Sequence, residues 1–343
     1  MVLLSLATAL PPHRIGQEEA KQVAARLFGG RTALFDRLSG VFDNAGIGAR
    51  HLIRPPEWYE TERGWEARNA AYLDAADTLY AEAAGKALAA AGVAADAVDC
   101  LVTVSTTGIA TPSLEARAAA RMGFRADAER VPVFGLGCAG GVTGLALAAR
   151  LAAERPGKTV LFVTVELCSV AMRLDKLSKA NIVATALFGD GAAAALVRSG
   201  EGGGLARIGA GAERLWPGTL GIMGWDVEDP GLGVVFDRAI PPFIEAHLAE
   251  GVRAIEDKVG EARAWCCHPG GAKVIEALEA SLGLAACTLA DERAVLRDHG
   301  NMSAPTVLFV LERLLARGLS APTLMLALGP GFTLSGLMLE PVR

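Results

Sequence analysis

Short β-branched runs alternate with helical segments over the first half of the chain. The runs DCLVTVST, VPVF and TVLFVTVEL occupy residues 99–106, 131–134 and 159–167, and helical patterns separate them at about 113–122 and 139–154. Strands that alternate with helices in this way imply one sheet whose faces the helices cover. The sequence therefore predicts an α/β protein with a largely parallel, covered sheet.

The rest of the chain repeats this arrangement in outline. Amphipathic patterns predict outer-layer helices at about 17–27, 34–45 and 66–91. The glycine-rich GEGGGLARIGAG, after AAAALVRS, predicts a bend or surface connection. Beyond it we expect helices near 237–258, 271–283 and 304–318, and strands at 262–267, 323–329 and 333–342. The predicted organisation is two halves, residues 1–200 and 201–343.

The charge balance and the cysteines exclude several classes of protein. Lys and Arg number 33 against 38 Asp and Glu, and no basic cluster is interleaved with aromatic residues, so nucleic-acid binding is not expected. Pro11 and Pro12 interrupt the N-terminal apolar run, so neither a signal peptide nor a membrane anchor is expected. The six cysteines lack paired spacing or a nearby histidine couple, which predicts a cytoplasmic protein without disulfides or a metal site.

The segment VPVFGLGCAGGVTGLALAARLAAERPG places Cys138 between glycines. A buried strand runs into Gly135 and Gly137, and Gly140 and Gly141 precede an apolar helix. Glycines permit a sharp turn, and the free N–H groups of a helix N-terminus favour a thiolate. Cys138 is therefore a candidate nucleophile, although a small buried cysteine at a tight turn would give the same pattern.

Two residues of the second half are candidates to act with Cys138. His268 ends an apolar strand in CCHPGG, and Asn301 precedes an apolar helix in HGNMSAPTVLFVLERL. A histidine at a strand end often faces a cleft, and an asparagine amide can donate to an oxyanion. The alternatives are a hydrogen-bonded core histidine and an ordinary helix N-cap. Cys, His and Asn in this order also fit a papain-like hydrolase, so the residue types leave the reaction open.

Five separated motifs point to one family. In order and spacing, the chain resembles the type III polyketide synthases, the chalcone synthase-like enzymes, in the motifs GLGCAGG, ALFGDGAAAALV, HPGGAKVIEALE, GNMSAPTVLFVLE and GPGFTLSGLMLEP. The resemblance runs from about residue 3 to the C-terminus. It implies a thiolase-like fold of two pseudo-duplicated α/β halves in αβαβα layers, a homodimer, and no metal or nicotinamide cofactor.

The resemblance also implies roles for the three candidates. Cys138 would take a starter acyl group from coenzyme A as a thioester, and His268 and Asn301 would bind the thioester carbonyl of malonyl-CoA as it loses CO₂. The resulting enolate needs two preorganised donors, and its carbon attacks the acyl-Cys138 carbonyl to form a C–C bond. A His268 imidazolium would also hold the sulfur as a thiolate.

Further positions are implied to contact substrates. The substrate-binding residues carried over from the resemblance are Thr106, Thr111, Cys168, Ala171, Phe188, Leu232, Val234, Gly329, Pro330 and Gly331. Phe188 matches a gatekeeping phenylalanine, and Val234 in GLGVVF stands where plant enzymes have a second one, which should widen the entrance. Thr106 matches the usual threonine, where relatives that form tetrahydroxynaphthalene tend to have cysteine.

Several positions depart from the plant enzymes. Thr111 occupies the place of a methionine that reaches across the dimer, and Cys168 and Ala171 replace cavity-lining threonines, which makes the wall less polar and roomier. The GFGPG loop of plant enzymes reads ALGPG at 327–331. Arg37 stands for one coenzyme A-binding cation, whereas the other two cations are replaced, so an acyl carrier protein could deliver the starter.

These features together predict a cytoplasmic, homodimeric type III polyketide synthase. We expect a fatty acyl-CoA starter, several malonyl-CoA extensions, and an alkylpyrone or alkylresorcinol product. The alternatives are a malonyl-only synthase of the tetrahydroxynaphthalene or phloroglucinol type, a ketoacyl carrier-protein synthase, and a silent thiolase-fold partner that binds acyl chains. Coenzyme A thioesters are expected as substrates, with no other cofactor, no nucleic acid and no membrane insertion.

Overall fold

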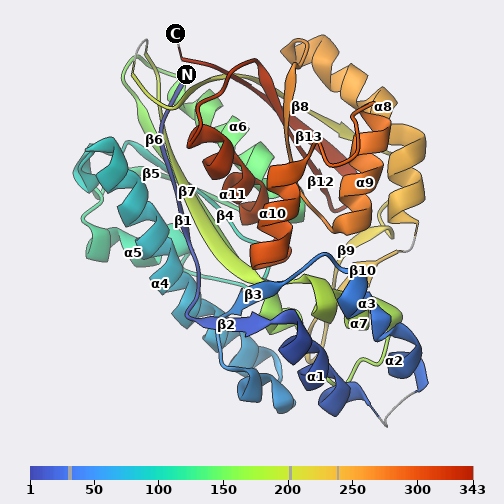
Figure 1. The fold of residues 1–343 in the computed structure, drawn as a ribbon. Helices are drawn as coiled ribbons and strands as arrows, with labels where there is room; N and C mark the ends of the chain where they lie inside the picture. Colours follow the sequence, from blue (N-terminus) through green and yellow to red (C-terminus); the bar gives the residue numbers. More distant parts are fainter. Residues whose placement is uncertain (30–32, 201–202, 238, 343) are drawn as a thin grey trace.

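A nine-stranded sheet forms the framework of the protein. The computed structural model describes residues 1–29, 33–200, 203–237 and 239–342. The strands of the large sheet are β1 (Val2–Ala9), β4 (Cys100–Val104), β5 (Glu129–Val133), β6 (Thr159–Leu167), β7 (Asp190–Arg198), β8 (Ala206–Leu215), β11 (Ala264–Cys267), β12 (Thr323–Gly329) and β13 (Thr333–Glu340). They follow the order β11-β12-β13-β8-β1-β7-β6-β4-β5 (Figure 1). Two antiparallel pairs stand apart, β2 (His13–Gly16) with β3 (Ala49–Leu52), and β9 (Met223–Glu228) with β10 (Gly231–Phe236).

Helices cover this sheet and connect its strands. They are α1 (Gln17–Phe28), α2 (Ala33–Leu38), α3 (Gly40–Asn44), α4 (Trp65–Ala91), α5 (Leu114–Met122), α6 (Gly140–Ala152), α7 (Lys179–Leu187), α8 (Ile240–Val259), α9 (Ala272–Ser281), α10 (Ala290–His299) and α11 (Ala304–Leu315). Short 3₁₀ turns are η1 (Pro56–Glu60), η2 (Ala95–Ala97), η3 (Gly137–Ala139) and η4 (Cys168–Ala171).

The apolar core is divided into layers. In one cluster, α6 and α11 pack between the strands of the first half and those of the second half. Helix α4 covers the outer side of the first-half strands, and α8 and α9 cover the outer side of the second-half strands. Figure 1 shows α4 and α5 on one flank, α6 and α11 in the middle, and α8 and α9 on the other flank. The predicted αβαβα layering is confirmed.

The sheet is mixed, so the prediction of a largely parallel sheet was wrong. Parallel pairs occur at the two ends of the sheet, where β4 pairs with β5 and β6, and β11 pairs with β12. The centre, from β6 through β7, β1, β8 and β13 to β12, is antiparallel. Burial on both faces makes a strand apolar whichever way it runs, so the apolar runs did not record strand direction.

The glycine-rich GEGGGLARIGAG is not merely a bend, because its last six residues begin strand β8. A Cβ at Gly211 would lie 2.8 Å from the Cβ of Ala146 in α6, and one at Gly209 would lie 3.3 Å from the Cβ of Met338 in β13. These glycines therefore permit close packing within the sheet rather than a turn. Because β8 pairs with β1, the sheet continues across the predicted boundary at residue 200. Residues 201 and 202 lie outside the described residues, and the division into halves stays a prediction.

Other elements were missed or divided. The N-terminal apolar run is β1, which pairs with β7 and β8 near the centre of the sheet. The helix predicted at 34–45 is two helices, α2 and α3, which meet at Gly40, a residue of poor helix propensity. The long helix predicted at 66–91 is α4, and Gly92 ends it in the left-handed conformation.

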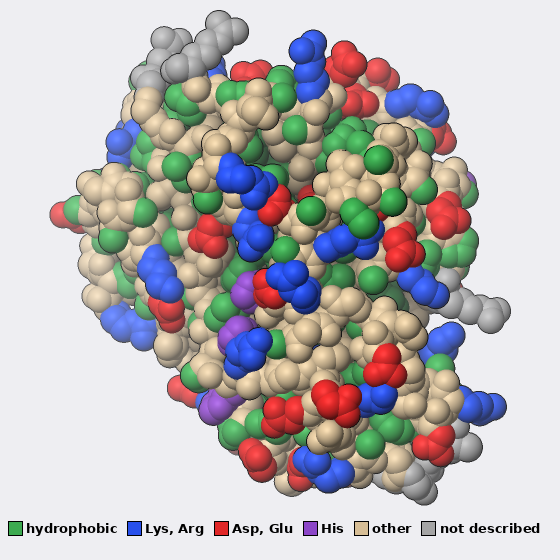
Figure 2. Space-filling model, viewed as in Figure 1, with side chains coloured by type: hydrophobic (Ala, Val, Ile, Leu, Met, Phe, Trp, Pro, Cys, Tyr) green, Lys and Arg blue, Asp and Glu red, His purple; other side chains and the backbone are tan. Residues whose placement is uncertain are grey.

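The surface carries mixed charge on the face that Figure 2 shows, where basic and acidic side chains are interspersed without a continuous basic area. None of the described helices combines the length and the hydropathy that a membrane span requires.

Candidate active site

Cys138 lies in the turn η3, between the end of β5 and the start of α6. Gly135 and Gly137 have φ angles of 94° and 48°, which favour glycine. A Cβ at Gly137 would also lie 2.7 Å from Pro330, so the turn and the predicted loop at 329–331 are in close contact. The side chain of Cys138 is 8% exposed. The structure thus places a nearly buried thiol at a helix N-terminus, as the glycine pattern predicted.

Asn301 and Ser303 reach Cys138 from the segment before α11. The side chains of both residues act on the Cys138 thiol and lower its pKa. Asn301 is not the N-cap of α11, because Ser303 occupies that position. The Asn301 amide instead donates to the carbonyl of Gly270 at 3.1 Å and accepts from the Ser303 N–H at 2.8 Å. Asn301 therefore connects the thiol to the turn that follows His268.

His268 directly follows β11 and is 5% exposed. Its backbone N–H donates to Leu326 at 2.8 Å, which extends the pairing of β11 with β12. Neither ring nitrogen has a hydrogen-bond partner among the described residues. The alternative of a hydrogen-bonded core histidine is therefore wrong. Buried polar atoms are rarely left unpaired, so the imidazole is free to bind a ligand group.

Burial controls the protonation of these groups. It raises the pKa of Cys138 to about 11, whereas the hydrogen bonds from Ser303 and Asn301 lower it. Burial also lowers the pKa of His268 to about 4. Each group by itself therefore favours its neutral form. The thiolate–imidazolium pair stays a prediction, and mutual attraction of the two charges would have to offset the burial of both.

A buried carboxylate behind Cys138 was missed. Glu166 in β6 is fully buried and accepts from the Thr106 N–H at 3.0 Å and from the Thr107 hydroxyl at 2.8 Å. Burial raises the pKa of Glu166 to about 7. The hydroxyl of Thr106 accepts from the N–H of Gly137 at 3.2 Å, so Thr106 supports the turn that carries Cys138. The only signal in the sequence is an acid within the otherwise apolar run TVLFVTVEL.

The pocket at Cys138 has an aromatic side wall. Phe188, Val234 and Pro330 line it, as the sequence predicted, together with Trp225. The ring centroids of Phe188 and Trp225 are 5.9 Å apart. Trp225, which the sequence analysis did not single out, faces this pocket. It comes from β9, whose pairing with β10 the sequence pattern did not predict.

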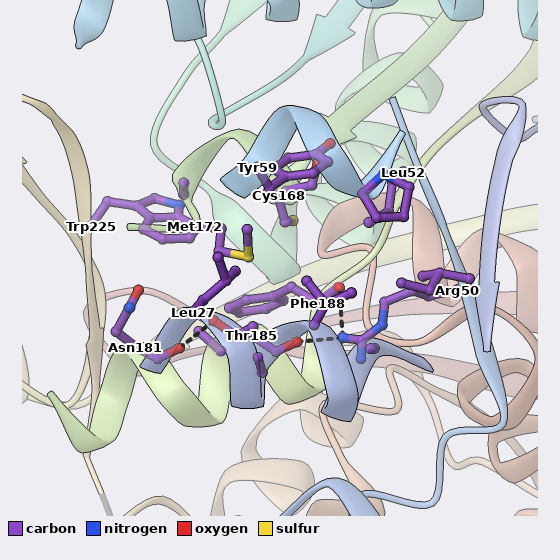
Figure 3. A pocket seen from close by; sticks show the side chains of 18 residues that line it. Leu27, Arg50, Leu52, Tyr59, Cys168, Met172, Asn181, Thr185, Phe188 and Trp225 are labelled. Atoms are coloured by element: carbon purple, nitrogen blue, oxygen red, sulfur yellow. Dashed lines mark hydrogen bonds between the residues drawn. The ribbon is translucent and has the colours of Figure 1, made fainter. Parts of the chain in front are cut away.

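A second, apolar pocket lies beyond Phe188 and Trp225, which line both pockets. Its cavity volume is only about 60 Å³. The lining residues come from α1, β3, η1, η4 and α7, and include Cys168 and Ala171 (Figure 3). We call this cavity the α1 pocket. Its wall is mostly aliphatic, which suits an apolar ligand.

The remaining predicted contacts lie elsewhere. Leu232 lines a small cavity with Thr107 and Ala171. Thr111 is exposed. Among the described residues that line the Cys138 pocket and the α1 pocket, it does not occur. Arg37 is exposed on α2 and likewise lines neither, because its position on that helix turns it to solvent. Their roles stay predictions.

The loop at 329–331 packs closely on the turn of Cys138. A Cβ at Gly329 would lie 2.6 Å from the Cβ of Ala139, and Gly331 has a φ of 68°. Only a residue without a side chain permits the first contact. No group of three or more His, Cys, Asp or Glu that could hold a metal ion occurs in the described ranges.

Comparisons with known proteins cover nearly the whole chain. The family model "Chalcone and stilbene synthases, N-terminal domain" matches residues 1–201, and the corresponding C-terminal model matches residues 207–343. The chain belongs to the chalcone and stilbene synthase family. A 1,3,6,8-tetrahydroxynaphthalene synthase of Streptomyces peucetius subsp. caesius is 41% identical to this synthase over 95% of this chain and 89% of the relative. A putative chalcone synthase of Bacillus subtilis is 35% identical over 96% of each chain.

Solved structures agree. The crystal structure of 1,3,6,8-tetrahydroxynaphthalene synthase from Streptomyces coelicolor superposes with a TM-score of 0.93 at 28% identity, over 100% of this chain and 99% of the other. The predicted thiolase-like fold and the predicted family are therefore confirmed. The protein is a type III polyketide synthase, a transferase that condenses malonyl-CoA units. The hydrolase that the residue types left open is ruled out.

Proposed function

We propose that Cys138 carries the growing acyl chain and that His268 and Asn301 bind the malonyl thioester. The observation that carries this proposal is the buried His268 imidazole, whose two nitrogens have no hydrogen-bond partner among the described residues. The side chain of Asn301, which acts on the Cys138 thiol, lies near it. An unpaired imidazole and an asparagine amide are suitable donors for a carbonyl oxygen that becomes negative. The thiol is the one nucleophile that acyl transfer from coenzyme A requires.

The reaction proceeds in two balanced steps. First, the Cys138 sulfur attacks the starter thioester, its proton is transferred away, and coenzyme A leaves as a thiol. Second, malonyl-CoA loses CO₂, and the electron pair of the broken C–C bond forms an enolate whose oxygen His268 and Asn301 stabilise. The enolate carbon attacks acyl-Cys138, a C–C bond forms, and the Cys138 sulfur is released to take up the extended chain again. Burial of the site limits hydrolysis of the thioester and protonation of the enolate.

We propose a fatty acyl-CoA as the starter, with an alkylpyrone or alkylresorcinol as the product. The α1 pocket supports this choice, because it adjoins the Cys138 pocket and its wall is mostly aliphatic. The second candidate is a malonyl-only synthase. It is favoured by the 41% identity to a relative named for tetrahydroxynaphthalene, a product without an alkyl chain.

Product masses distinguish these candidates. The purified enzyme is given malonyl-CoA with acetyl, medium-chain, long-chain and aromatic acyl-CoA starters in turn. We expect products that are heavier than each fatty starter by several C₂ units. Tetrahydroxynaphthalene from malonyl-CoA alone, with no starter incorporated, would overturn the fatty starter and support the second candidate. A single extension would instead favour the ketoacyl synthase type of reaction.

We further propose that two copies of the chain associate at the edge strand β5. An open pocket between β4, β5 and α5 is bordered there by Phe134 and Ile109, which are 61% and 53% exposed. Exposed apolar side chains around a sheet edge favour pairing with another protein surface. Exposed Thr111 lies on the adjoining loop, consistent with its proposed reach across a dimer. Sedimentation of the wild type and of Phe134→Asp tests this, and a wild-type monomer would overturn it.

Delivery of substrates completes the proposal. Exposed Arg37 would contact coenzyme A phosphates, and a carrier protein remains the alternative donor of the starter. All six cysteines are free, which fits the proposed cytoplasmic location. Comparison of acyl-CoA with acyl carrier protein as the donor decides between the two routes, and a preference for the carrier protein would contradict direct use of coenzyme A thioesters.

A further inference from the structure

Arg50 is a buried cation whose hydrogen bonds converge on the end of α7. It lies in β3 and is 2% exposed. Its Nη1 donates to the carbonyls of Thr185 at 2.6 Å and Phe188 at 3.2 Å, and its Nη2 donates to Oε1 of Gln17 at 2.6 Å. Figure 3 shows the guanidinium beside Thr185 and Phe188 at the wall of the α1 pocket.

Every carbonyl at this helix end has a partner. Gln17, held by Arg50, donates through Nε2 to the carbonyl of Ala186 at 3.2 Å. The next carbonyl, that of Leu187, accepts from the Asn301 N–H at 2.9 Å. The last carbonyls of a helix lack partners within the helix, and a cation near them interacts favourably with the helix dipole. Arg50 and Gln17 therefore fix the point at which α7 ends and Phe188 begins.

The same helix end is attached to Asn301. Phe188 and Asn301 form an isolated parallel bridge, in which the N–H of Gly189 donates to the carbonyl of Asn301 at 3.0 Å. The side chain of Arg50 supports this bridge from behind. A Cβ at Gly189 would lie 3.2 Å from the Cβ of Arg50, and a Cβ at Gly300 would lie 3.4 Å from it.

We propose that Arg50 is a positioning residue for the condensation, which fixes Phe188 and, through the Phe188–Asn301 bridge, the amide of Asn301. Phe188 forms the wall between the two pockets, and Asn301 is the proposed donor to the malonyl oxyanion. A single buried guanidinium thus sets both the acyl-chain wall and the donor. The inference rests on the role of Asn301 in the proposed function.

Removal of the guanidinium should slow decarboxylation without removing any group that is proposed to contact malonyl-CoA. Lysine in place of Arg50 keeps the charge but cannot hold two carbonyls and Gln17 in one plane. A small displacement of the Asn301 amide is expected to lower kcat for malonyl-CoA decarboxylation by about 10- to 100-fold. KM for malonyl-CoA should change less than kcat, because Arg50 contributes no proposed contact to the coenzyme.

A double-mutant cycle tests the proposal. Release of CO₂ from malonyl-CoA is measured for the wild type, Arg50→Lys, Asn301→Ala and the double variant. If Arg50 acts through Asn301, Arg50→Lys should slow the wild type but change the Asn301→Ala enzyme less than twofold. Equal fold losses in both backgrounds would overturn the inference. If Asn301→Ala alone has no effect, the proposed function of Asn301 fails, and the inference fails with it.

Two further variants keep the experiment decisive. Arg54→Gln is the matched control, because Arg54 follows β3 on the same segment, but its side chain is 30% exposed and pairs with Asp74 at 2.7 Å. Its CO₂ release should equal that of the wild type. If circular dichroism shows that Arg50→Lys does not fold, Gln17→Met takes its place in the cycle, since it removes one partner of the guanidinium and the bond to Ala186. Additive losses with Gln17→Met would then contradict the proposal.

Discussion

Cys138, His268 and Asn301 owe their chemical character to burial and to the groups that replace water around them. Ser303 and Asn301 act on the thiol and lower its pKa, while the imidazole has no hydrogen-bond partner among the described residues. Because the imidazole of His268 has no partner and the thiol of Cys138 has polar neighbours, a substrate oxygen would bind at His268. This asymmetry supports the proposed division of roles, in which Cys138 bonds covalently and His268 binds the enolate.

The first prediction concerns the Asn301 amide. Asn301→Ala should slow malonyl-CoA decarboxylation by roughly 10²–10³, the usual loss for one oxyanion donor. Acylation of Cys138 should be reduced much less, because the amide is not the nucleophile. Release of CO₂ and acyl-enzyme formation are measured separately. An unchanged rate of CO₂ release would reduce Asn301 to a structural residue of the Phe188 bridge.

The second prediction concerns the proposed sharing of a proton between Cys138 and His268. Burial raises the pKa of Cys138, and an imidazolium beside it would act in the opposite direction. His268→Gln should therefore move the alkylation of Cys138 by iodoacetamide to higher pH. Peptide masses report the reaction, and exposed Cys287 in the same sample is the internal control. Identical pH profiles with and without His268 would show that the two groups do not share a proton.

At the residue scale, sequence reasoning found the candidate reactive groups but not the residues that support them. Cys138 and His268 are rare residue types at strand ends with glycines nearby, so they could be singled out. Arg50, Glu166 and Trp225 could not, because their roles depend on contacts between distant segments. Arg50 bonds to Thr185, and Trp225 contacts Phe188. Such pairings leave no periodic or local pattern in a single sequence.

At the scale of elements, the hairpin β9–β10 determines the shape of the pocket. It carries Trp225 and Val234 into the wall of the Cys138 pocket. The turn end of the hairpin is attached to the body of the protein by Glu228, which pairs with Lys176 and, at 3.4 Å, with Arg173. The backbone carbonyl of Glu228 also accepts from the indole of Trp65 at 2.7 Å. The hairpin is therefore held at its turn, while Trp225 and Val234 face the Cys138 pocket.

The third prediction concerns the width of the pocket. Val234 is 8% exposed in the pocket wall, so Val234→Phe adds a ring to space that an acyl chain would use. We expect kcat/KM for long-chain starters to fall by about tenfold relative to acetyl-CoA, since overpacking costs roughly 1–3 kcal/mol. Val227→Phe is the control, because Val227 lies in the same hairpin but is 78% exposed. Equal activity of Val234→Phe on all chain lengths would remove this residue from the acyl path.

Elements with strong patterns were predicted well, and those defined by pairing were not. The apolar run at 159–167 coincides with β6, and the run at 323–329 coincides with β12. By contrast, β8 has exposed and buried residues in irregular order and two glycines, Gly209 and Gly211, so its sequence resembled a loop. Strand direction was also missed, because it is set by connections such as the tight turn between β12 and β13 rather than by side-chain type.

At the scale of the whole molecule, the site is assembled from both halves. The first half contributes Cys138 at the start of α6, and the second half contributes His268 after β11 and Asn301 before α11. Helices α6 and α11 form the middle layer and pack on each other within the largest part of the core. The layering therefore brings the start of α6, the end of β11 and the start of α11 together at the candidate site. Sequence resemblance predicted this arrangement, whereas composition and periodicity alone predicted only a covered α/β sheet.

The fourth prediction concerns stability at acid pH. Burial lowers the pKa of His299 to about 4, and its stacked neighbour His51 acts in the same direction. In the unfolded chain a histidine titrates near pH 6.5. Between about pH 6.5 and 4 the unfolded state therefore binds a proton that the folded state does not, so this contribution to stability is lost as the pH falls.

His299→Phe removes the group that binds this proton in the unfolded state. The decrease in Tm between pH 7 and pH 5 should be smaller for His299→Phe than for the wild type, as measured by calorimetry. The comparison between variants is needed because buried acids oppose the trend. Burial raises the pKa of Glu292 to about 7 and of Asp190 to about 6, and such groups stabilise the folded state as the pH falls. An equal decrease in Tm for both proteins would contradict the assignment to His299.

The central claim is that an acyl chain is held on Cys138, and peptide mass spectrometry tests it most directly. The wild type and Cys138→Ala are incubated with a fatty acyl-CoA in the absence of malonyl-CoA, digested at low pH, and their cysteine peptides are weighed. The account predicts one added acyl group on the peptide that contains Cys138, and none on any peptide of Cys138→Ala. An acyl group on another cysteine, or on none, would contradict it.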